Sequence, residues 1–291
     1  MENCKEKLQY FQPQLRFNPF ALKGMDAALN RVVRAINNRE KIVIYGYYDL
    51  DGISSIALLL LVFKYLNADV EYFVPNVISP NFNINSEDVK NNIKALGAKL
   101  LITVGCGSSS FSQIKMCNNL GIDVIVTDYH EVKGTTDEII INPKQENCNY
   151  EFKFLSASGV AFKLVQAIAS YYRMKSINKY LDLVMLGTVA QEVPLIGENK
   201  FIVEEGIKQL KKTNNYGINA WKKIYKLNEE NETAIFEFVK KIGSTRTLEG
   251  RIDNARIAVE LFTTSDKYRA EQIAKYLNNE IEKRIREISI S

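Results

Sequence analysis

The sequence predicts an α/β protein with a doubly wound parallel sheet, followed by a helical C-terminal half that ends in a long helix. Between residues 41 and 143, short β-branched runs alternate with helix-like stretches, a pattern typical of right-handed strand–helix–strand crossovers. The runs are continuously apolar, as expected for parallel strands that are buried on both faces. After Ser156, apolar residues recur at three- and four-residue spacing, which indicates helices.

The elements follow in order along the chain. Five strands are predicted, each rich in Val and Ile, at residues 41–46, 69–74, 98–104, 121–127 and 138–143. Helices are predicted between them at residues 51–66, 86–96 and 111–120. The first of these helices is apolar nearly all round, which predicts that it is buried. Further helices are predicted at residues 159–173, 177–190, 201–212, 234–242, 252–263 and 265–288, with a polar break at 227–233.

The composition bounds the class of protein. Hydrophobic residues make up 46% of the 291 residues and charged residues 25%, which is ordinary for a globular protein with a core. The net charge of +4 permits a polyanionic partner without requiring one. The four cysteines show no metal-ligand spacing, the first residues contain no signal peptide, and no apolar run is long enough to cross a bilayer. We therefore expect a cytoplasmic protein that has no membrane partner.

Polar residues follow three of the predicted strands. Asp49, Gly105 and Asp128 each come just after a strand end, and ligands of open parallel sheets collect at that edge. Asp49 and Asp51 form an Asp-x-Asp pair, which Asp128 and His130 could join. Carboxylates suit Mg²⁺ or Mn²⁺, and a histidine favours Mn²⁺. Two such ions about 3.5–4 Å apart can activate water against a phosphodiester, but four side chains are too few to hold both ions well.

The chain resembles the DHH phosphoesterase family, and within it the RecJ-type single-strand-specific 5′-to-3′ DNA exonucleases. The resemblance rests on several segments that occur in the family's order. They are NPFALKGMDAALNRVVRAI, KIVIYGYYDLDGISSIALL, GIDVIVTDYHE, IIINPK, GVAFKL, YLDLVMLGTVAQEVPL and GENKFIVEEGI. Together they cover roughly residues 17–262. The resemblance implies a two-metal phosphoesterase domain.

The chain departs from the family pattern where the resemblance implies metal ligands. The family has Asp, Asp, His and Asp at the positions that are occupied here by Tyr47, Gly105, Tyr129 and Gln191. The carboxylate missing at Gly105 is the one that would bridge the two metals. The resemblance keeps Asp49, Asp51 and Asp128 as metal ligands and His130 as a contact to the scissile phosphate. With four ligands lost, we expect these residues to be vestigial or to hold one ion weakly.

The survivors also have structural interpretations. An Asp can cap the helix that follows it, and His130 can be a hydrogen-bonded structural residue. Arg246 and Arg251 lie in a segment that is similar to a substrate loop of the family, so they are predicted to contact nucleic acid. The stripe formed by Ala270, Ile273, Leu277, Ile281, Ile285 and Ile288 either packs on its own domain or binds a protein partner or a second copy.

The predicted domains are an N-terminal segment and first helix at residues 1–40, a DHH-type α/β domain at 41–200, and a helical extension at 201–291. The resemblance implies that residues 265–288 are a linker helix truncated before a DHH-associated domain. The favoured hypothesis is a catalytically inactive single-stranded-DNA binder or scaffold in DNA replication or repair. One alternative is a residual metal-dependent exonuclease or small-phosphoester hydrolase that uses Mn²⁺ or Mg²⁺, and another is a decaying gene product without a selected role.

Overall fold

The protein is represented by a computed structural model that describes residues 17–76, 82–132, 137–228, 230–243 and 252–290. Its centre is a five-stranded sheet in the order β2-β1-β3-β4-β5, and every neighbouring pair of strands is parallel. This confirms the predicted parallel sheet. The strands are β1 (Ile42–Gly46), β2 (Val70–Phe73), β3 (Leu100–Val104), β4 (Asp123–Thr127) and β5 (Ile139–Ile141).

Alternate strand residues face two separate hydrophobic clusters. Ile42 and Ile44 of β1 belong to a large cluster that includes α1 (Met25–Asn37), α2 (Leu50–Tyr65) and α5 (Ala157–Tyr172). Val43 and Tyr45 belong to a smaller cluster with α4 (Phe111–Asn119) and the π-helical turn η4 (Val89–Ile93). Helices therefore cover both faces of the sheet, which explains why the strands are apolar at every position.

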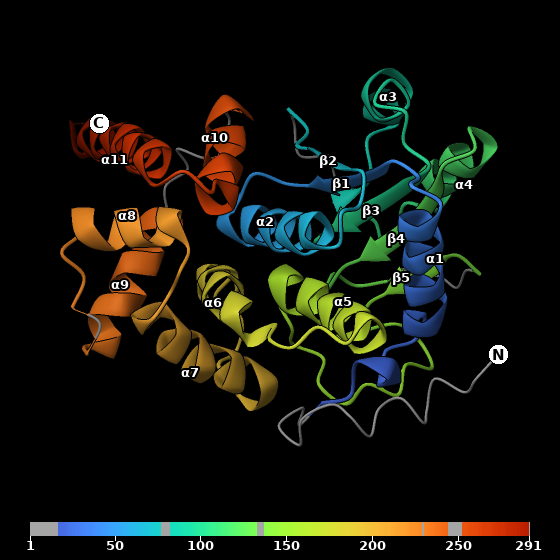
Figure 1. Cartoon of the computed structure of the whole chain (residues 1–291), viewed down its shortest axis with the longest axis horizontal. Coiled ribbons are helices and arrows are strands. Elements are labelled where there is room, and N and C mark those ends of the chain that lie inside the picture. Colours follow the sequence, from blue (N-terminus) through green and yellow to red (C-terminus); the bar gives the residue numbers. More distant parts are fainter. Residues whose placement is uncertain (1–16, 77–81, 133–136, 229, 244–251, 291) are drawn as a thin grey trace.

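The C-terminal half adds helices to the large cluster. Figure 1 shows the sheet on the right and α8 to α11 on the left, with α2, α5 and α6 near the centre. Helix α2 contacts α5, α6 and α10, so it is surrounded by other elements, as its uniformly apolar sequence predicts. The elements are η5 (Asn178–Tyr180), α6 (Leu181–Ala190), α7 (Gly197–Lys211), α8 (Tyr216–Ile224), α9 (Glu232–Gly243), α10 (Ile252–Thr263) and α11 (Lys267–Ile290).

The structure differs from the predicted elements in a few places. A short 3₁₀ turn, η2 (Pro19–Ala21), precedes α1, and the helix predicted at residues 86–96 is a single turn, α3 (Ser86–Asp88), that continues into η4. Helix α8 was not predicted at all. It begins at the Asn215 cap, whose side chain accepts from the backbone N–H of Ile218. Its polar, glycine-containing start resembles a loop in sequence, and in the structure the helix packs against α10 and α11.

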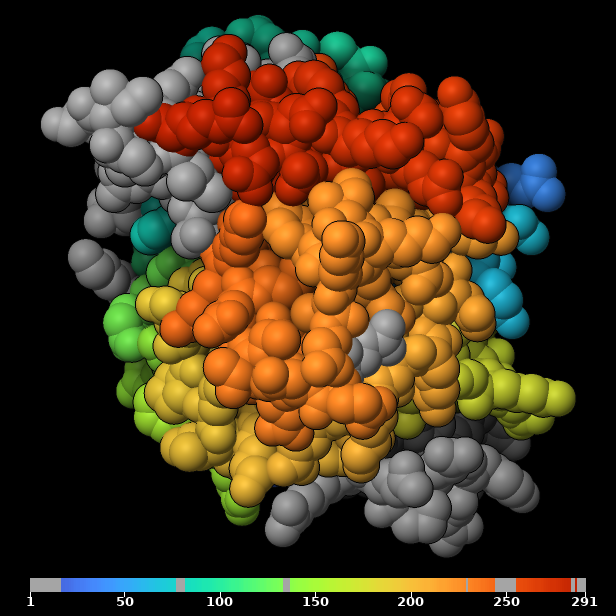
Figure 2. All heavy atoms as spheres, turned by 90° about the vertical axis from the view of Figure 1, so that its left-hand side faces the viewer, coloured from blue at the N-terminus to red at the C-terminus, as the bar shows by residue number. Residues whose placement is uncertain are grey.

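The first four residues of the apolar stripe of the last helix are covered within the chain, while the side chains of Ile285 and Ile288 lie outside the described part of the structure. Ala270, Ile273, Leu277 and Ile281 of α11 are all buried, and α11 packs on α8 and α10. Figure 2 shows α11, in red, packed along the orange helices beneath it. This outcome supports the prediction that the stripe packs on its own domain. The alternative prediction required a free surface for a protein partner or for self-association, and these four residues do not form one.

Two further predictions concern the whole chain. Among the residues that the structure describes, no helix combines the length and apolar character needed to cross a membrane. The predicted domain boundaries at 40/41 and 200/201 stay predictions, and the second lies inside α7. The large hydrophobic cluster runs from Leu22 to Ile281 and includes buried residues on both sides of residue 200.

Candidate functional site at the carboxyl edge of the sheet

The loops after β1, β3 and β4 meet at the carboxyl edge of the sheet. The strand order reverses between β1 and β3, because β1 is followed by β2 on one side and β3 lies on its other side. Open α/β sheets bind ligands at such a reversal point. The loops that carry Asp49 and Gly105 flank it, and Asp128 follows the next strand. The sequence-predicted convergence of these three loops is present in the structure.

Asp49 caps the helix that follows β1. Its carboxylate accepts a hydrogen bond of 2.6 Å from the backbone N–H of Gly52, which is the expected N-cap geometry. A Cβ atom at Gly52 would lie 2.4 Å from the carbonyl oxygen of Tyr47. The Asp49–Gly52 pair therefore has a structural reason that is independent of any cation.

Asp51 serves a different helix from the one that contains it. Its buried carboxylate accepts backbone N–H bonds from Ala157 (2.8 Å) and Ser158 (2.9 Å), at the N-terminus of α5. Gly187 of α6 leaves the room for this contact, since a Cβ there would lie 2.6 Å from Asp51 Oδ1. Burial, and next the charge of Asp49, raise the pKa of Asp51 to about 6, although the amide bonds oppose this shift.

Asp128 is buried and occupied on both oxygens. Oδ2 accepts from the backbone N–H of Ser108 at 2.9 Å, and Oδ1 accepts from that of Tyr129 at 2.8 Å. Nδ1 of His130 lies 2.8 Å from the same Oδ1. Burial alone would raise the pKa of Asp128, but the hydrogen bond and charge of His130, with the Ser108 bonds, lower it overall. Asp128 therefore organises its own loop as an ionised carboxylate.

Two of the replaced ligand positions lie close together. The side chain of Gln191 is near enough to the Tyr129 phenol to oppose the rise in its pKa, although the two residues are far apart in sequence. Burial first, and then the charges of Asp51, Asp49 and Asp128, raise the pKa of the Tyr129 phenol above its usual range. The neutral phenol therefore lies within the influence of all three carboxylates.

Gly105 is the third replaced position, and the same ring lies beside it. Its φ of +66° is in the left-handed region, which favours glycine. A Cβ there would lie 3.0 Å from the Cβ of Ala157 and 3.9 Å from Cε1 of Tyr129. A Cβ at position 105 would therefore crowd the start of α5, whereas its distance from the Tyr129 ring is an ordinary contact.

Tyr47, the fourth replaced position, faces the other side of the sheet edge. It is buried in the smaller hydrophobic cluster with Tyr45. Its hydroxyl donates to the backbone oxygen of Asn83 at 2.9 Å, and its ring meets Phe82 edge-on. Tyr47 therefore braces the segment that precedes α3, a role that a carboxylate could not take without burying a charge.

His130 lies between two aromatic rings. Phe82 stacks on it with a centroid distance of 4.1 Å and an interplanar angle of 16°, and Tyr129 stacks at 4.3 Å and 30°. Together with the Asp128 hydrogen bond, these contacts fix the position of the imidazole ring against the loop after β4. Sequence reasoning missed Phe82, Ser108 and the Ala157–Ser158 amides. The Ser156 cap at the start of α5 is the one local signal that a helix N-terminus is present near this edge.

The predicted nucleic-acid contacts Arg246 and Arg251 lie outside the described residues, so they stay predictions. Within the described part of the chain, no group of three or more His, Cys, Asp or Glu side chains is arranged to hold a metal ion. Asp49, Asp51 and Asp128 are brought to one edge, but each is bound to backbone amides of a different segment.

Comparisons with known proteins show which family and which proteins this chain is similar to. The profile of the DHH family, N-terminal domain, matches residues 41–188. The chain is 35% identical over 277 residues to the single-stranded-DNA-specific exonuclease RecJ of Bacillus subtilis, covering 92% of this chain and 34% of that protein. It is 33% identical over 287 residues to the protein of the same name from Haemophilus influenzae, covering 94% and 49%. The chain thus spans about a third to a half of the length of these curated relatives.

Solved structures give the same assignment of the fold. An exonuclease RecJ bound to manganese superposes with a TM-score of 0.80 at 26% identity, covering 90% of this chain and 66% of that one. The Thermus thermophilus RecJ in complex with Mn²⁺ superposes with a TM-score of 0.79 at 26% identity, covering 94% and 39%. The sequence-predicted fold class is therefore confirmed.

Proposed function

Because the chain belongs to the DHH family, we propose that it binds single-stranded DNA without cutting it. The DNA part of this proposal rests on the relatives, which are single-stranded-DNA-specific exonucleases. The proposed absence of cleavage rests on the residues that occupy the ligand positions at the carboxyl edge of the sheet. Fold membership alone does not carry an activity, so the site residues must decide it.

The observation that carries the proposal is the neutral Tyr129 phenol, which lies within the influence of Asp49, Asp51 and Asp128 and 3.9 Å from the place of a Cβ at Gly105. Where the family pattern has a histidine and two carboxylates, this chain has a phenol, an amide and no side chain. Affinity for hard divalent cations depends on the number of charged oxygen ligands. As they stand, these residues do not fit a pair of Mn²⁺ or Mg²⁺ ions.

The remaining carboxylates support the same proposal, because structural roles account for them. Asp49 caps α2, Asp51 binds the start of α5, and Asp128 closes its own loop. Each role would be retained after a loss of metal chemistry. The same proposal includes a protein partner in a replication or repair assembly, although the buried residues Ala270, Ile273, Leu277 and Ile281 of α11 do not provide its surface.

A second candidate is a residual metal-dependent nuclease or small-phosphoester hydrolase. It is favoured by one observation: Asp49, Asp51 and Asp128 still converge at the reversal point of the sheet. A single divalent cation held there would share carboxylates that already accept charge-assisted amide hydrogen bonds, and this sharing costs it part of its affinity. This cost makes the non-cleaving proposal the better supported one.

The test combines binding and cleavage on the same substrate. A 5′-labelled single-stranded oligonucleotide should bind with an affinity that falls as salt rises, and it should stay intact at saturating Mn²⁺. The comparison variant is Tyr129→His with Gln191→Asp, which restores two of the ligands of the family pattern. Cleavage by the native protein that chelator abolishes and that Asp128→Asn removes would overturn the proposal.

A further inference from the structure

A group of basic residues lies at the amino edge of the sheet, opposite the candidate site. Helices α2 and α5 both begin at the carboxyl edge, where Asp51 of α2 accepts from the N–H of Ala157 at the start of α5. Each helix has 16 residues and the two pack on each other, so both end roughly 24 Å away, at the amino edge. The chain after α5 then returns to the end of α2, because Lys179 Nζ of η5 lies 5.5 Å from the centroid of the Tyr65 ring.

Three segments that meet at this edge carry basic residues and no Asp or Glu. They are residues 63–68, 171–181 and 208–216, and the third reaches the edge because the Thr213 hydroxyl donates to Asp182 in the first turn of α6. Their exposed, unpaired cations form the amino-edge basic surface, which consists of Lys64, Arg173, Lys175, Lys179 and Lys212. Within the described part of the chain, none of these five is in an ion pair, whereas the nearby Asp69 pairs with Lys41 at 2.5 Å.

The helix dipole explains some of these cations but not Lys179. Lys64 is in the last turn of α2 and Arg173 follows α5, where a cation complements the negative end of a helix. Lys179 instead comes just before α6, at the positive end of that helix, where a cation is unfavourable. Two rings hold it there, since Nζ lies 4.8 Å from the centroid of Tyr180 and 5.5 Å from that of Tyr65. Lys179 is exposed and Tyr65 is 62% exposed, so this ammonium group is both positioned and accessible.

We propose that the amino-edge basic surface binds the phosphate backbone of a nucleic-acid strand, as a contact separate from the candidate site. The proposal rests on the single-strand binding proposed above and adds a surface to it. A strand that binds without metal ions needs cations elsewhere, because Asp49 and Asp128 repel phosphates at the carboxyl edge. Lysine and arginine neutralise phosphates whatever the base sequence, and this neutralisation supplies non-specific affinity.

A membrane of anionic lipids fits the same surface less well. Binding at a membrane interface combines basic residues with apolar side chains that enter the lipid. The large exposed hydrophobic residues of the three segments are all tyrosines, namely Tyr65, Tyr171 and Tyr216. Charge without an exposed aliphatic side chain favours a nucleic acid.

The experiment measures how binding depends on salt. Fluorescence anisotropy is recorded for the full chain with labelled oligo(dT) and with an abasic strand of equal length, at several salt concentrations. The test variant neutralises three residues of the surface: Lys64→Gln, Lys175→Gln and Lys179→Gln. The matched control removes the same charge from three exposed lysines elsewhere: Lys94→Gln, Lys115→Gln and Lys275→Gln.

We expect the slope of log Kd against log salt to fall by about 2 in the test variant, because a single strand contributes about 0.7 for each neutralised phosphate. If affinities are equal near about 1 M salt, this slope means about 100-fold weaker binding at about 0.1 M. The abasic strand should show the same fall, because its phosphates are unchanged. The control variant should keep the native slope.

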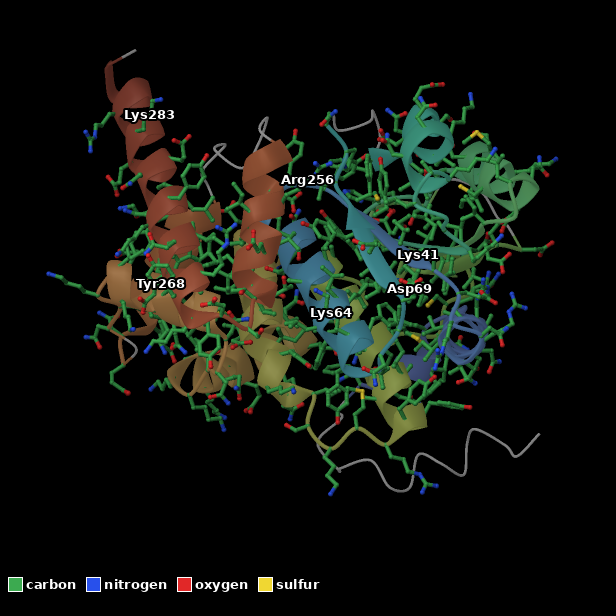
Figure 3. The ribbon with its side chains drawn as sticks, turned by 45° about the horizontal axis from the view of Figure 1, so that its top comes forward. Lys41, Lys64, Asp69, Arg256, Tyr268 and Lys283 are labelled. Atoms are coloured by element: carbon green, nitrogen blue, oxygen red, sulfur yellow. The ribbon has the colours of Figure 1, made fainter. Side chains whose placement is uncertain are left out.

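The tyrosine ring gives a second readout that changes no charge. Tyr65→Leu removes one ring from Lys179 and should weaken oligo(dT) binding by about 2- to 5-fold, the size of an exposed cation–π contact. Tyr268→Leu removes a ring that is 71% exposed on α11, and it should bind as the native protein does. Figure 3 shows Tyr268 on α11 and Lys64 at the end of α2.

The outcomes distinguish this surface from the proposed function. If the native protein binds neither strand, both are wrong. If it binds oligo(dT) but the folded test variant keeps the native slope, or the control variant falls equally, single-strand binding stands and only the surface is overturned. The surface is also overturned if the test variant loses binding to phosphatidylserine vesicles but not to oligo(dT). Circular dichroism checks folding, and if the test variant is unfolded, Lys179→Met alone should lower the slope by about 0.7.

Discussion

Gly52 and Gly159 occupy equivalent positions in two helices but have different neighbours. Each donates its N–H to an N-cap side chain three residues earlier, Asp49 in one case and Ser156 in the other. A Cβ at Gly52 would lie 2.4 Å from the backbone oxygen of Tyr47, whereas at Gly159 the nearest atom, 3.1 Å away, is the end of the Leu155 side chain. A rigid backbone atom cannot move aside, but a leucine methyl can.

Gly52→Ala is therefore expected to lower the free energy of unfolding by about 1–3 kcal/mol, the usual cost of overpacking. Gly159→Ala should be near neutral, because the gain in helix propensity offsets a small shift of Leu155. Urea unfolding monitored by circular dichroism measures both. Equal effects of the two substitutions would contradict the steric explanation.

The buried Asp182 predicts a pH dependence of stability. Burial raises the pKa of Asp182 to about 6, against the opposing hydrogen bonds from the Thr213 hydroxyl and the N–H of Leu183. The carboxyl titrates near about 4 in the unfolded chain. The folded state therefore retains a proton that the unfolded state releases, and the free energy of unfolding falls as pH rises from about 4 to 6.

Asp182→Asn should remove this contribution, which is at most about 3 kcal/mol for a shift of about two units. Part of the fall should remain, since the pKa of Asp51 is also raised to about 6. Asp128, whose pKa is lowered, contributes in the opposite sense and only below about pH 4. Urea unfolding at several pH values between 4 and 7 tests this, with the exposed Asp26→Asn as control. A pH profile of Asp182→Asn that matches the native one would refute the assignment.

At the scale of elements, a buried ion pair joins α5 to α7. Lys163 Nζ lies 2.5 Å from Glu198 Oε1, and both side chains are almost fully buried. Nζ also donates to the backbone oxygen of Phe17 at 3.0 Å, and the Tyr150 hydroxyl donates to Glu198. Burial lowers the pKa of Lys163, against the stabilising charge of Glu198. The pair therefore connects two helices and the segment before α1.

Lys163→Met should lower the free energy of unfolding by about 3–5 kcal/mol, because it leaves a buried carboxylate without its partner. The double variant Lys163→Met with Glu198→Gln should recover much of this loss, since the amide oxygen can still accept from Tyr150 and no charge is buried. A double-mutant cycle from urea unfolding gives the coupling energy. Additive losses would mean that the two charges do not stabilise each other.

The packing of the last helix, α11, also depends on a buried side chain. Leu277 is 2% exposed in α11, which packs on α8 and α10. Leu277→Glu places a charge in this contact and should destabilise the fold by several kcal/mol, on the order of 3–5. Tyr276→Glu, at an adjacent position that is 44% exposed, should cost little. Thermal unfolding compares them, and an unchanged melting temperature for Leu277→Glu would contradict the observed packing.

At the scale of the whole molecule, the question is whether the fold gains stability from a divalent cation. Ligand at about 100 times its dissociation constant adds about 2.7 kcal/mol, which is a rise of several degrees in melting temperature for a chain of this size. The native protein is expected to show no rise with Mn²⁺ up to about 1 mM relative to chelator-treated protein. Tyr129→His with Gln191→Asp should show one. A rise in the native protein that Asp128→Asn abolishes would restore the metal hypothesis.

Much of the fold could be predicted because its signals are local. The continuous β-branched run of β1 predicts a strand that is buried on both faces, and the uniformly apolar α2 predicts a surrounded helix. Alternation of such strands and helices along the chain then favours a parallel sheet with helices on its faces. The positions of Asp49 and Asp128 at strand ends follow from the same pattern. The resemblance to the family could also be recognised from the sequence, because the family's motifs occur here in the same order.

The sequence by itself thus determined the parallel sheet, the edge at which the candidate site lies, and the identity of the residues that depart from the family pattern. The tertiary structure decided what the residues at this edge contact. Asp51 binds the start of α5, the side chain of Gln191 lies near the Tyr129 phenol, and Phe82 stacks on His130 in a left-handed conformation. Each of these contacts joins segments that are far apart in the chain. Local periodicity carries no information about such pairs, because they form only when separate elements pack together.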